Sequence, residues 1–534
     1  MDNLESCLDK AWEDTKKLFC YPPLRRPVFS NTLDTAAIDM LSNKIWVNEK
    51  FVEFVCNVSI LNKNPVDYTT ILKGILQHEV NHYILCPSDV SNMIILQNEV
   101  KKITKEYYQV VANYFFDFVV NLDIVKRKKR TELLCVYKNL LMNHPLDLLN
   151  VAFLQKKTKE NLNVKITDEL LLSKLDSLCK IDYLNKRKWR KSSRKFAEII
   201  KDLLSEENID NLNPLDVWDF KNYNASEIEK GILDASKELA ILDFKEIVDN
   251  ERIYLPYSPI VSFYEQQSKK FLIKVKGKQS GADFQNCEHK KYEISDSYSS
   301  VDIFNSYGKF MPGFSQSWKN NNNSENNNPV LIPDLIIAID SSMSMPDPSL
   351  VNSSAVIGAF CAARYYLERN SLVATYNFSD NIYITDFSND KNLIYSNLCL
   401  YQKSGTFFGL DSMKKLVDSA RNKTDIILIS DMEIFNLGQT IEYLKNLRKT
   451  NRIALFMFGD AIINEDYARE ISNFFSKTPE INIYYVKDIT EIPKIVIGEC
   501  YKNYSKSSNY SKLIAYSKSL RNIGGDKNGR ESNK

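Results

Sequence analysis

Two histidines separated by three residues form the first pattern in the chain that could do chemistry. They stand in the run His78-Glu79-Val80-Asn81-His82, and the chain has only four histidines in all. On a helix, residues four apart lie on one face, so both imidazoles would point at one spot. Neutral imidazoles suit Zn²⁺, and Glu79 beside them can take a proton from zinc-bound water. The pattern therefore predicts a hydrolytic zinc site.

A catalytic zinc usually needs a third protein ligand. Residues 110–125 are almost wholly apolar, and their polar exceptions Asn113, Asp117 and Asn121 are spaced by four, which places them on one helical face. A buried carboxylate is costly unless it is paired or binds a metal, so Asp117 is the predicted third ligand. Three other residues remain as alternatives: Glu99, Cys86 and Asp89. Without a metal, the histidines would belong to the core or surface and Asp117 would pair with a basic residue.

A second set of polar residues carries only oxygen ligands. These residues are Asp340, Ser342, Ser344, Thr406 and Asp431. The first three follow the apolar run 335–339, the fourth precedes a predicted helix, and the last follows the apolar run 425–430. Two carboxylates and three hydroxyls suit a hard cation such as Mg²⁺ or Mn²⁺. The alternative is that the Asp-x-Ser-x-Ser pattern only caps a helix.

The elements that must position this second set alternate between strand and helix patterns. Predicted strands cover residues 335–339, 372–378, 425–430, 453–458 and 481–486, and predicted helices cover 354–368, 410–420 and 441–447. Such alternation predicts an α/β fold with a doubly wound parallel sheet, in which ligands bind beyond the carboxyl ends of the strands.

The N-terminal part reads as mainly helical. Apolar residues recur with helical period over residues 71–84, and Pro87 ends that helix. A strand is predicted near Trp46, which is a candidate for aligning an extended peptide by edge pairing. The predicted domains are a zinc peptidase domain at 1–150, a connecting region at 151–318, an Asn-rich linker at 319–330, the α/β domain at 331–500 and a flexible tail at 501–534.

Composition excludes several classes of function. The 534 residues include 70 Lys and Arg against 68 Asp and Glu, a net charge of +2, so no global field favours nucleic acid. The basic runs at 126–130 and 186–191 are interpreted as solvated helix ends. Ten scattered cysteines form no disulfide framework, and no uncharged apolar run could span a bilayer. A cytoplasmic protein without a membrane segment is expected.

Four N-terminal segments and the C-terminal pattern together resemble a known family. The segments are residues 35–39, 46–48, 78–82 and 117–121. They look like successive landmarks of bacterial and archaeal proteins with an N-terminal metallopeptidase-type domain and a C-terminal von Willebrand factor A-like domain. This resemblance covers nearly the whole chain. It implies a zincin-like N-terminal domain and a partnership with MoxR-type AAA+ ATPases.

The von Willebrand factor A resemblance also implies roles for the oxygen ligands. Ser342 and Ser344 would contact the cation directly, and Thr406 would complete the site when a ligand is bound. Asp340 and Asp431 would act largely through water, and an open position would take a carboxylate from a protein partner. Two residues stand where the family usually has glycine: Ser404 and Met432.

The sequence thus supports two hypotheses of different classes. In the first, the chain is a zinc-dependent peptidase with a cation-dependent, protein-binding A-type domain. In the second, it is a non-enzymatic adaptor of an AAA+ ATPase that remodels protein complexes. The two hypotheses differ in the role that they give to Glu79.

Overall fold

The computed structural model divides into two compact units, Met1–Phe263 and Tyr264–Lys534. It describes residues 4–140, 144–204, 220, 223–271, 289–293, 295, 301–302, 306, 311–313, 315–318, 332–420, 423–458, 481–486 and 488–504. No boundary between units falls near residue 150, because α9 and α11 of the expected connecting region pack on α4. The predicted linker at 319–330 and the predicted tail beyond Tyr504 lie outside the described residues.

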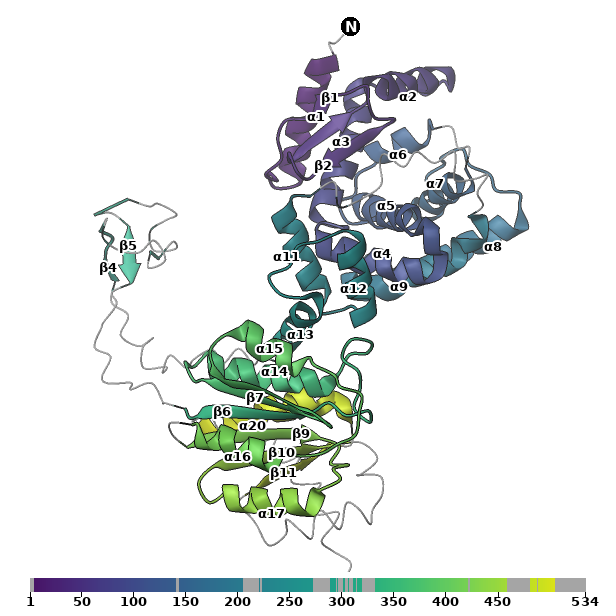
Figure 1. Cartoon of the computed structure of the whole chain (residues 1–534). Helices are drawn as coiled ribbons and strands as arrows, with labels where there is room; N and C mark the ends of the chain where they lie inside the picture. The colour runs from purple at the N-terminus through teal and green to yellow at the C-terminus, as the bar shows by residue number, and fades with distance from the viewer. Residues whose placement is uncertain are drawn as a thin grey trace, which may run out of the picture. The chain divides into compact units, whose positions relative to one another are not determined.

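Unit 1 is built mainly of helices, with one small sheet (Figure 1). The helices are α1 (Leu4–Leu18), α2 (Glu49–Leu61), α3 (Tyr68–Ile84), α4 (Val90–Thr104), α5 (Tyr108–Lys126), α6 (Glu132–Tyr137), α7 (Pro145–Thr158), α8 (Glu169–Leu178), α9 (Trp189–Ile200), α11 (Ala225–Ala235) and α12 (Ile241–Asn250). The division between the units falls within the residues of α13 (Pro259–Lys269).

The small sheet has the strand order β1-β3-β2. Its strands are β1 (Val28–Phe29), β2 (Ala36–Asp39) and β3 (Lys44–Val47). The strand predicted near Trp46 is therefore present as β3, but its suggested role in edge pairing is wrong. β3 is hydrogen-bonded on both sides, parallel to β1 and antiparallel to β2, which leaves β2 at the edge.

Helix α3 forms where the apolar period predicted it. Asp67 caps its first turn by accepting a hydrogen bond from the backbone N–H of Thr70 at 3.0 Å. The apolar face of α3 is buried, with Ile71, Leu72 and Val80 fully excluded from solvent. This face packs against α1, α2, α5 and α6, so α3 is a rigid support for the side chains it carries.

Unit 2 contains a six-stranded sheet in the order β11-β10-β9-β6-β7-β8. The strands are β6 (Asp334–Asp340), β7 (Val373–Phe378), β8 (Ile382–Ser388), β9 (Thr424–Ser430), β10 (Arg452–Met457) and β11 (Asn482–Tyr485). All neighbours are parallel except β7 and β8, which are antiparallel. This mixed α/β architecture with a mostly parallel sheet agrees with the predicted class. The same unit also contains a short hairpin, β4 (His289–Lys291) and β5 (Gln316–Trp318).

Helices cover both faces of this sheet (Figure 1). They are α14 (Ser354–Leu367), α15 (Lys391–Leu398), α16 (Leu410–Asp418), α17 (Leu437–Leu447) and α20 (Ile492–Tyr504). On one face, Ile336 and Ala338 of β6 pack in a buried cluster with α16 and α17. Because side chains alternate along a strand, Ile337 points to the opposite face, where α14 contacts both β6 and α20. Strand β6 is therefore buried on both sides, as its continuous apolar run predicts.

Most of the strands and helices predicted for this unit are present within two or three residues of the predicted bounds. The described strands and α-helices that were not predicted include β8, α15, α20 and the hairpin of β4 and β5. Strand β8 is largely solvent-accessible, so it lacks the continuous apolar run that marks the central strands. Among the described residues, no helix is long and apolar enough to cross a membrane.

Candidate functional site

Helices α3 and α5 bring the predicted zinc ligands together. His78 and His82 lie one turn apart on α3, and Asp117 projects from the facing α5. Nε2 of His82 lies 3.0 Å from Nε2 of His78 and 3.1 Å from Oδ1 of Asp117. The third separation, from Nε2 of His78 to Oδ1 of Asp117, is 3.5 Å. The ligand atoms of all three residues lie within 4.8 Å of one another.

The Nδ1 nitrogen of each imidazole lies within hydrogen-bond distance of an oxygen atom. Nδ1 of His82 lies 2.7 Å from the backbone carbonyl of Cys86, which can only accept a hydrogen bond. Nδ1 of His78 lies 2.8 Å from Oδ1 of Asn121, whose amide nitrogen donates to Tyr137 Oη at 2.9 Å. Both Nδ1 atoms therefore donate, so each neutral ring presents the lone pair of Nε2 to the other ring and to the carboxylate.

These three groups fit a zinc ion. Three electron-pair donors at 3.0–3.5 Å repel one another unless a cation or a proton lies between them. A tetrahedral ion with ligand bonds of about 2.0–2.1 Å would place its ligands about 3.3 Å apart, which falls within the observed range. Two imidazoles and one carboxylate form a catalytic type of ligand set, which leaves a position for water or substrate.

Without a metal, the pKa values of all three groups in the cluster are shifted from their ordinary values. Burial lowers the pKa of the two imidazoles, but Asp117 outweighs burial at His78 and raises its pKa to about 9. At His82, burial and the neighbouring His78 keep the pKa below its ordinary value. Burial opposes ionisation of Asp117, but hydrogen bonds from both histidines lower its pKa to about 2. A proton on His78 therefore stabilises the metal-free cluster, and a metal ion must displace that proton.

The cluster opens into a cavity of about 620 Å³. Glu79 lines this cavity beside the two histidines and is buried. Edge strand β2 forms another part of the wall, with the side chains of Ala36 and Ile38 buried and those between and after them partly accessible. Tyr114 and Asp147 line the cavity as well, the first donating to the second at 2.7 Å. The cavity thus combines the histidine cluster, a buried carboxylate and a strand at the edge of the small sheet.

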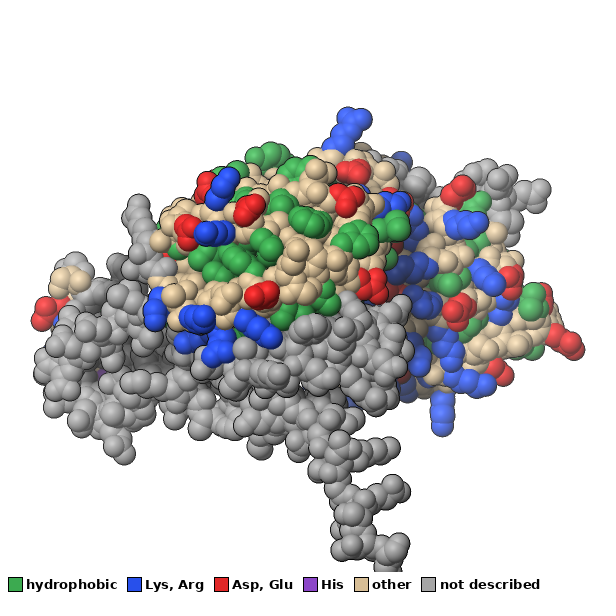
Figure 2. Space-filling model, turned by 60° about the horizontal axis from the view of Figure 1, so that its bottom comes forward, with side chains coloured by type: hydrophobic (Ala, Val, Ile, Leu, Met, Phe, Trp, Pro, Cys, Tyr) green, Lys and Arg blue, Asp and Glu red, His purple; other side chains and the backbone are tan. Residues whose placement is uncertain are grey.

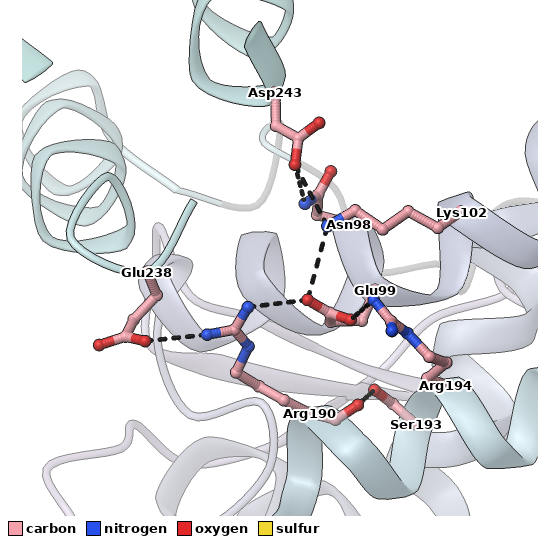
Figure 3. A network of polar contacts seen from close by, with 8 residues as sticks. All are labelled: Asn98, Glu99, Lys102, Arg190, Ser193, Arg194, Glu238 and Asp243. Atoms are coloured by element: carbon pink, nitrogen blue, oxygen red, sulfur yellow. Dashed lines mark hydrogen bonds and ion pairs between the residues drawn. The ribbon is translucent and has the colours of Figure 1, made fainter. Parts of the chain in front are cut away.

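The alternative ligands for the zinc site lie elsewhere. Glu99 accepts hydrogen bonds from Arg190 at 2.8 Å and from Arg194 at 2.6 Å, with Lys102 Nζ at 3.6 Å (Figure 3). Arg190 also contacts Glu238 at 2.9 Å, so this network ties α4 to α9 and to the segment before α12. Glu99 is thus a structural counter-ion and the prediction that it could bind the metal is wrong.

The other two alternatives are also engaged in structural roles. Asp89 caps α4 by accepting from the backbone N–H of Asn92 at 2.8 Å. Cys86 contributes its backbone carbonyl to His82, and its thiol does not belong to the cluster of His78, His82 and Asp117. Asp117 itself pairs with the two histidines rather than with a lysine or arginine.

The two basic runs serve local contacts. Arg127 lies 3.4 Å from Asp123 and donates to the Leu184 carbonyl at 2.6 Å, while Lys188 lies 3.0 Å from Asp182. Figure 2 shows both acidic and basic side chains on the described surface of that view, in keeping with the balanced composition. The run at 126–130 follows the C-terminus of α5, as interpreted, but the run at 186–191 lies at the start of α9, so its interpretation as a C-terminal helix end is wrong.

The residues predicted as oxygen ligands in unit 2 lie on loops at the carboxyl edge of the sheet. Asp340 ends β6, and Asp431 follows β9, which is the parallel neighbour of β6. The loop that carries Thr406 is held at this edge, because Ser404 O accepts from the backbone N–H of Met343 at 2.9 Å. Thr406 O in turn accepts from the N–H of Phe435 at 3.0 Å. Three loops therefore meet at this edge: one follows β6, one follows β9, and one connects α15 to α16.

Hydrogen bonds fix the groups at the centre of this edge. Oδ2 of Asp340 accepts from Ser430 Oγ at 2.7 Å, and its Oδ1 accepts from the N–H of Ser342 at 2.9 Å. The Oγ atoms of Ser342 and Ser344 lie 3.1 Å apart. Burial raises the pKa of Asp340 to about 6, and the nearby charge of Asp431 adds to the rise. Two buried carboxylates near each other, with the hydroxyls of Ser342 and Ser344 on the loop after β6, fit a divalent cation.

The helix-capping alternative for this pattern is wrong. Helix α14 begins at Ser354 and is capped by Ser353, well after the Asp-x-Ser-x-Ser run. Met432 has a φ of +66°, a backbone conformation that glycine adopts more easily. The position is thus one where glycine would be expected, and the buried Met432 side chain instead packs into the core cluster.

Some residues around the first site were not found from the sequence. Asn121 was noted only for its spacing, yet it holds His78. Tyr114, Tyr137 and Asp147 carry no motif, and the structure alone brings them to the cavity wall. Only the four-residue spacing of polar groups in an apolar helix pointed toward this part of the site.

Comparisons with known proteins add little to these observations. No known protein family matches the chain, and no curated protein matches it. Among solved structures, one similar chain is described as the crystal structure of Deinococcus radiodurans RO (RSR) protein. It shares 10% identity over 84% of this chain and 91% of that chain, with a TM-score of 0.22. At that TM-score, the similarity supports no conclusion about fold or function.

Proposed function

We propose that unit 1 is a zinc-dependent peptidase. His78, His82 and Asp117 would hold the zinc, and Glu79 would be the general base. The observation that carries this proposal is the convergence of two Nε2 lone pairs and one carboxylate oxygen at 3.0–3.5 Å on the wall of a cavity of about 620 Å³. A purely structural cluster would have no need to face such a cavity.

The chain's own residues would each have a defined task. When bound, zinc supplies Lewis acidity, which lowers the pKa of a water to about 7 and polarises a carbonyl. Glu79 stands at the cavity wall, where a carboxylate can accept the proton of that water and pass it to the leaving amine. Asn121 and the carbonyl of Cys86 keep the two rings oriented through their Nδ1 atoms.

Strand β2 supports a peptide as the substrate. Its outer edge makes no strand pairing among the described residues, and four of its residues, Ala36–Asp39, line the cavity. An extended peptide could add to this edge through backbone hydrogen bonds, which would hold a peptide bond near Glu79. This role belongs to β2, not to the strand that carries Trp46.

A Glu79→Gln variant tests this proposal directly. The variant should keep zinc and the fold but lose cleavage of a peptide library by at least about 100-fold, as expected for the loss of a general base. Glu53→Gln, which alters an exposed glutamate on α2, is the matched control and should cleave at the wild-type rate. Equal cleavage by the Glu79→Gln and wild-type chains would refute the proposed base. No cleavage by wild type would instead favour the adaptor hypothesis, in which a MoxR-type AAA+ ATPase is the partner.

A second function is favoured by the edge of the sheet in unit 2. We propose that this unit is a von Willebrand factor A-like domain that binds Mg²⁺ or Mn²⁺ through Asp340, Ser342, Ser344, Thr406 and Asp431. The supporting observation is an apolar rim on the same loops: Met343, Phe407 and Phe435 are 67%, 48% and 81% exposed. Exposed apolar side chains around a cation site suit a protein partner that presents a carboxylate.

Partner capture with and without a chelator tests this second function. Asp340→Ala should abolish Mg²⁺-dependent capture, whereas Asp411→Ala, at an exposed position on α16, should capture as wild type does. Capture that persists in a chelator would contradict the proposal. The family resemblance, which joins a peptidase domain and an A-type domain in one chain, is part of the same proposal.

A further inference from the structure

The cavity of unit 1 is lined by more carboxylates than the proposed zinc centre uses. Its lining includes four carboxylates and neither lysine nor arginine. They are Asp39, Glu79, Asp117 and Asp147. Asp117 and Glu79 belong to the proposed zinc centre. Asp39 is used by the turn after β2, where it accepts from the N–H of Leu41 at 2.9 Å and from Ser42 Oγ.

Asp147 is the one carboxylate of this lining that neither belongs to the proposed zinc centre nor serves a turn. It stands in the first turn of α7, and among the described residues its one hydrogen-bond partner is Tyr114, which donates from Oη at 2.7 Å. Tyr114 precedes Asp117 by three residues on α5, so both project from the same face of that helix. Asp147 therefore lies on the cavity wall beside the proposed zinc centre.

The first turn of a helix stabilises a carboxylate, which is one structural reason for Asp147 to be present. That effect does not explain why the side chain faces a cavity. Burial raises the pKa of Asp147, and the hydrogen bond from Tyr114 and the nearby His144 oppose the rise only in part. Among the described residues, neither lysine nor arginine contributes to the pKa shift of Asp147. Its negative charge is incompletely compensated in the free chain.

We propose that Asp147 is a specificity-determining residue, which binds a cationic group of the peptide substrate. The group is an ammonium or a guanidinium, carried either by a basic side chain or by a free N-terminus. Such a group would compensate a half-buried carboxylate in a cavity whose lining contains no lysine or arginine. This inference rests on the proposed peptidase function of the same cavity.

Binding without turnover tests the inference separately from catalysis. The zinc-loaded full chain with Glu79→Gln is titrated with fluorescent peptides that differ at one position, lysine or norleucine, both N-terminally acetylated. A second pair carries norleucine and has either a free or an acetylated N-terminus. The charged member of one pair should bind about tenfold more tightly, a difference typical of one charge-assisted contact. The pair that shows it identifies the source of the cation.

Adding Asp147→Asn should reduce the preference to less than about twofold, because the amide carries no charge. Adding Asp39→Asn is the matched control, since Asp39 lines the same cavity but serves a turn, and the preference should persist. Equal binding within both peptide pairs, or a preference that survives Asp147→Asn, would overturn the inference. Since the Glu79→Gln chain that keeps Asp147 can by itself show equal binding, the test holds even if the Asp147 variant does not fold. If the Glu79→Gln chain shows the charge preference while the wild-type chain cleaves no peptide, the peptidase proposal fails and the charge-binding role of Asp147 stands.

Discussion

The Nε2 atoms of His78 and His82 lie 3.0 Å apart, while an oxygen on the far side of each ring holds its Nδ1 atom. This arrangement directs two lone pairs at each other, with the carboxylate of Asp117 beside them. A neutral, metal-free cluster of this kind would be repulsive. The relationship therefore accounts both for the raised pKa of His78 and for the proposed affinity for zinc.

Asn121 should tune this affinity without touching the metal. Replacing Asn121 with alanine removes the acceptor for His78 Nδ1, so the ring loses its fixed tautomer and orientation. Zinc affinity should fall by about 10- to 100-fold, as is typical for such outer partners. Competition with a chromophoric chelator measures the change. Asn113→Ala, one turn before Asp117, is the control, and an unchanged affinity in Asn121→Ala would show that the tautomer is fixed by other means.

The ion pairs around Glu99 should stabilise unit 1 at pH values above the ordinary pKa of a glutamate. Burial opposes ionisation of Glu99, but Arg190, Lys102 and Arg194 lower its pKa below the usual 4.5. The stabilisation is thus fully present above pH 4.5 and is lost as the pH falls through the lowered pKa. Because both arginines are partly exposed, Glu99→Gln should cost only about 1–2 kcal/mol of unfolding free energy at pH 7.

Urea unfolding of the full chain at pH 7 and at pH 4 measures this cost. The difference between wild type and Glu99→Gln should shrink at the lower pH. Glu238→Gln removes a glutamate that contacts only the outer side of Arg190, so it should change the unfolding free energy by less than about 0.5 kcal/mol. A Glu99→Gln difference that is the same at both pH values would show that the network's charge contributes nothing.

Parts of this molecule follow from sequence because local patterns reflect local forces. The continuous apolar run of β6 predicts a strand buried on both faces, and the spacing of His78 and His82 predicts a shared helical face. Asp117 was identifiable because a carboxylate in an apolar helix needs a partner. In each case the residue type and the period together carry the information.

Other parts depend on how distant elements pack, and no local pattern encodes that. The edge position of β2 follows from pairing with β3, and Trp46 could not reveal which strand would be central. Asp147 reaches the cavity because α7 packs on α5. Met432 has a φ that glycine adopts more easily, and its side chain is buried in the core cluster. The free energy gained by burying this side chain offsets the backbone strain, and burial of this kind depends on tertiary packing.

Asp340 should destabilise unit 2 until a cation binds. Its pKa is raised by burial to about 6 from 3.8, so the folded state gains stability from the proton below pH 3.8 and loses it as the pH rises toward 6. In a chelator at pH 8, Asp340→Asn should therefore unfold at a higher temperature than wild type, with a gain of about 1–3 kcal/mol. Adding Mg²⁺ should stabilise wild type and leave the variant unchanged.

Differential scanning fluorimetry with and without Mg²⁺ measures both effects. Asp386→Asn, on the accessible strand β8, is the control and should respond to Mg²⁺ as wild type does. If Mg²⁺ stabilises Asp340→Asn as much as wild type, the cation does not bind at the edge formed by β6 and β9.

The zinc content of the purified chain tests the central claim most directly. Native mass spectrometry should find one zinc per wild-type chain and none in Asp117→Ala or His82→Ala, while Glu79→Gln keeps the full amount. Binding should also release protons at pH 7, because the metal displaces the proton held by His78. A wild-type chain that takes up no zinc, or an Asp117→Ala chain that takes up as much as wild type, would contradict the proposed centre.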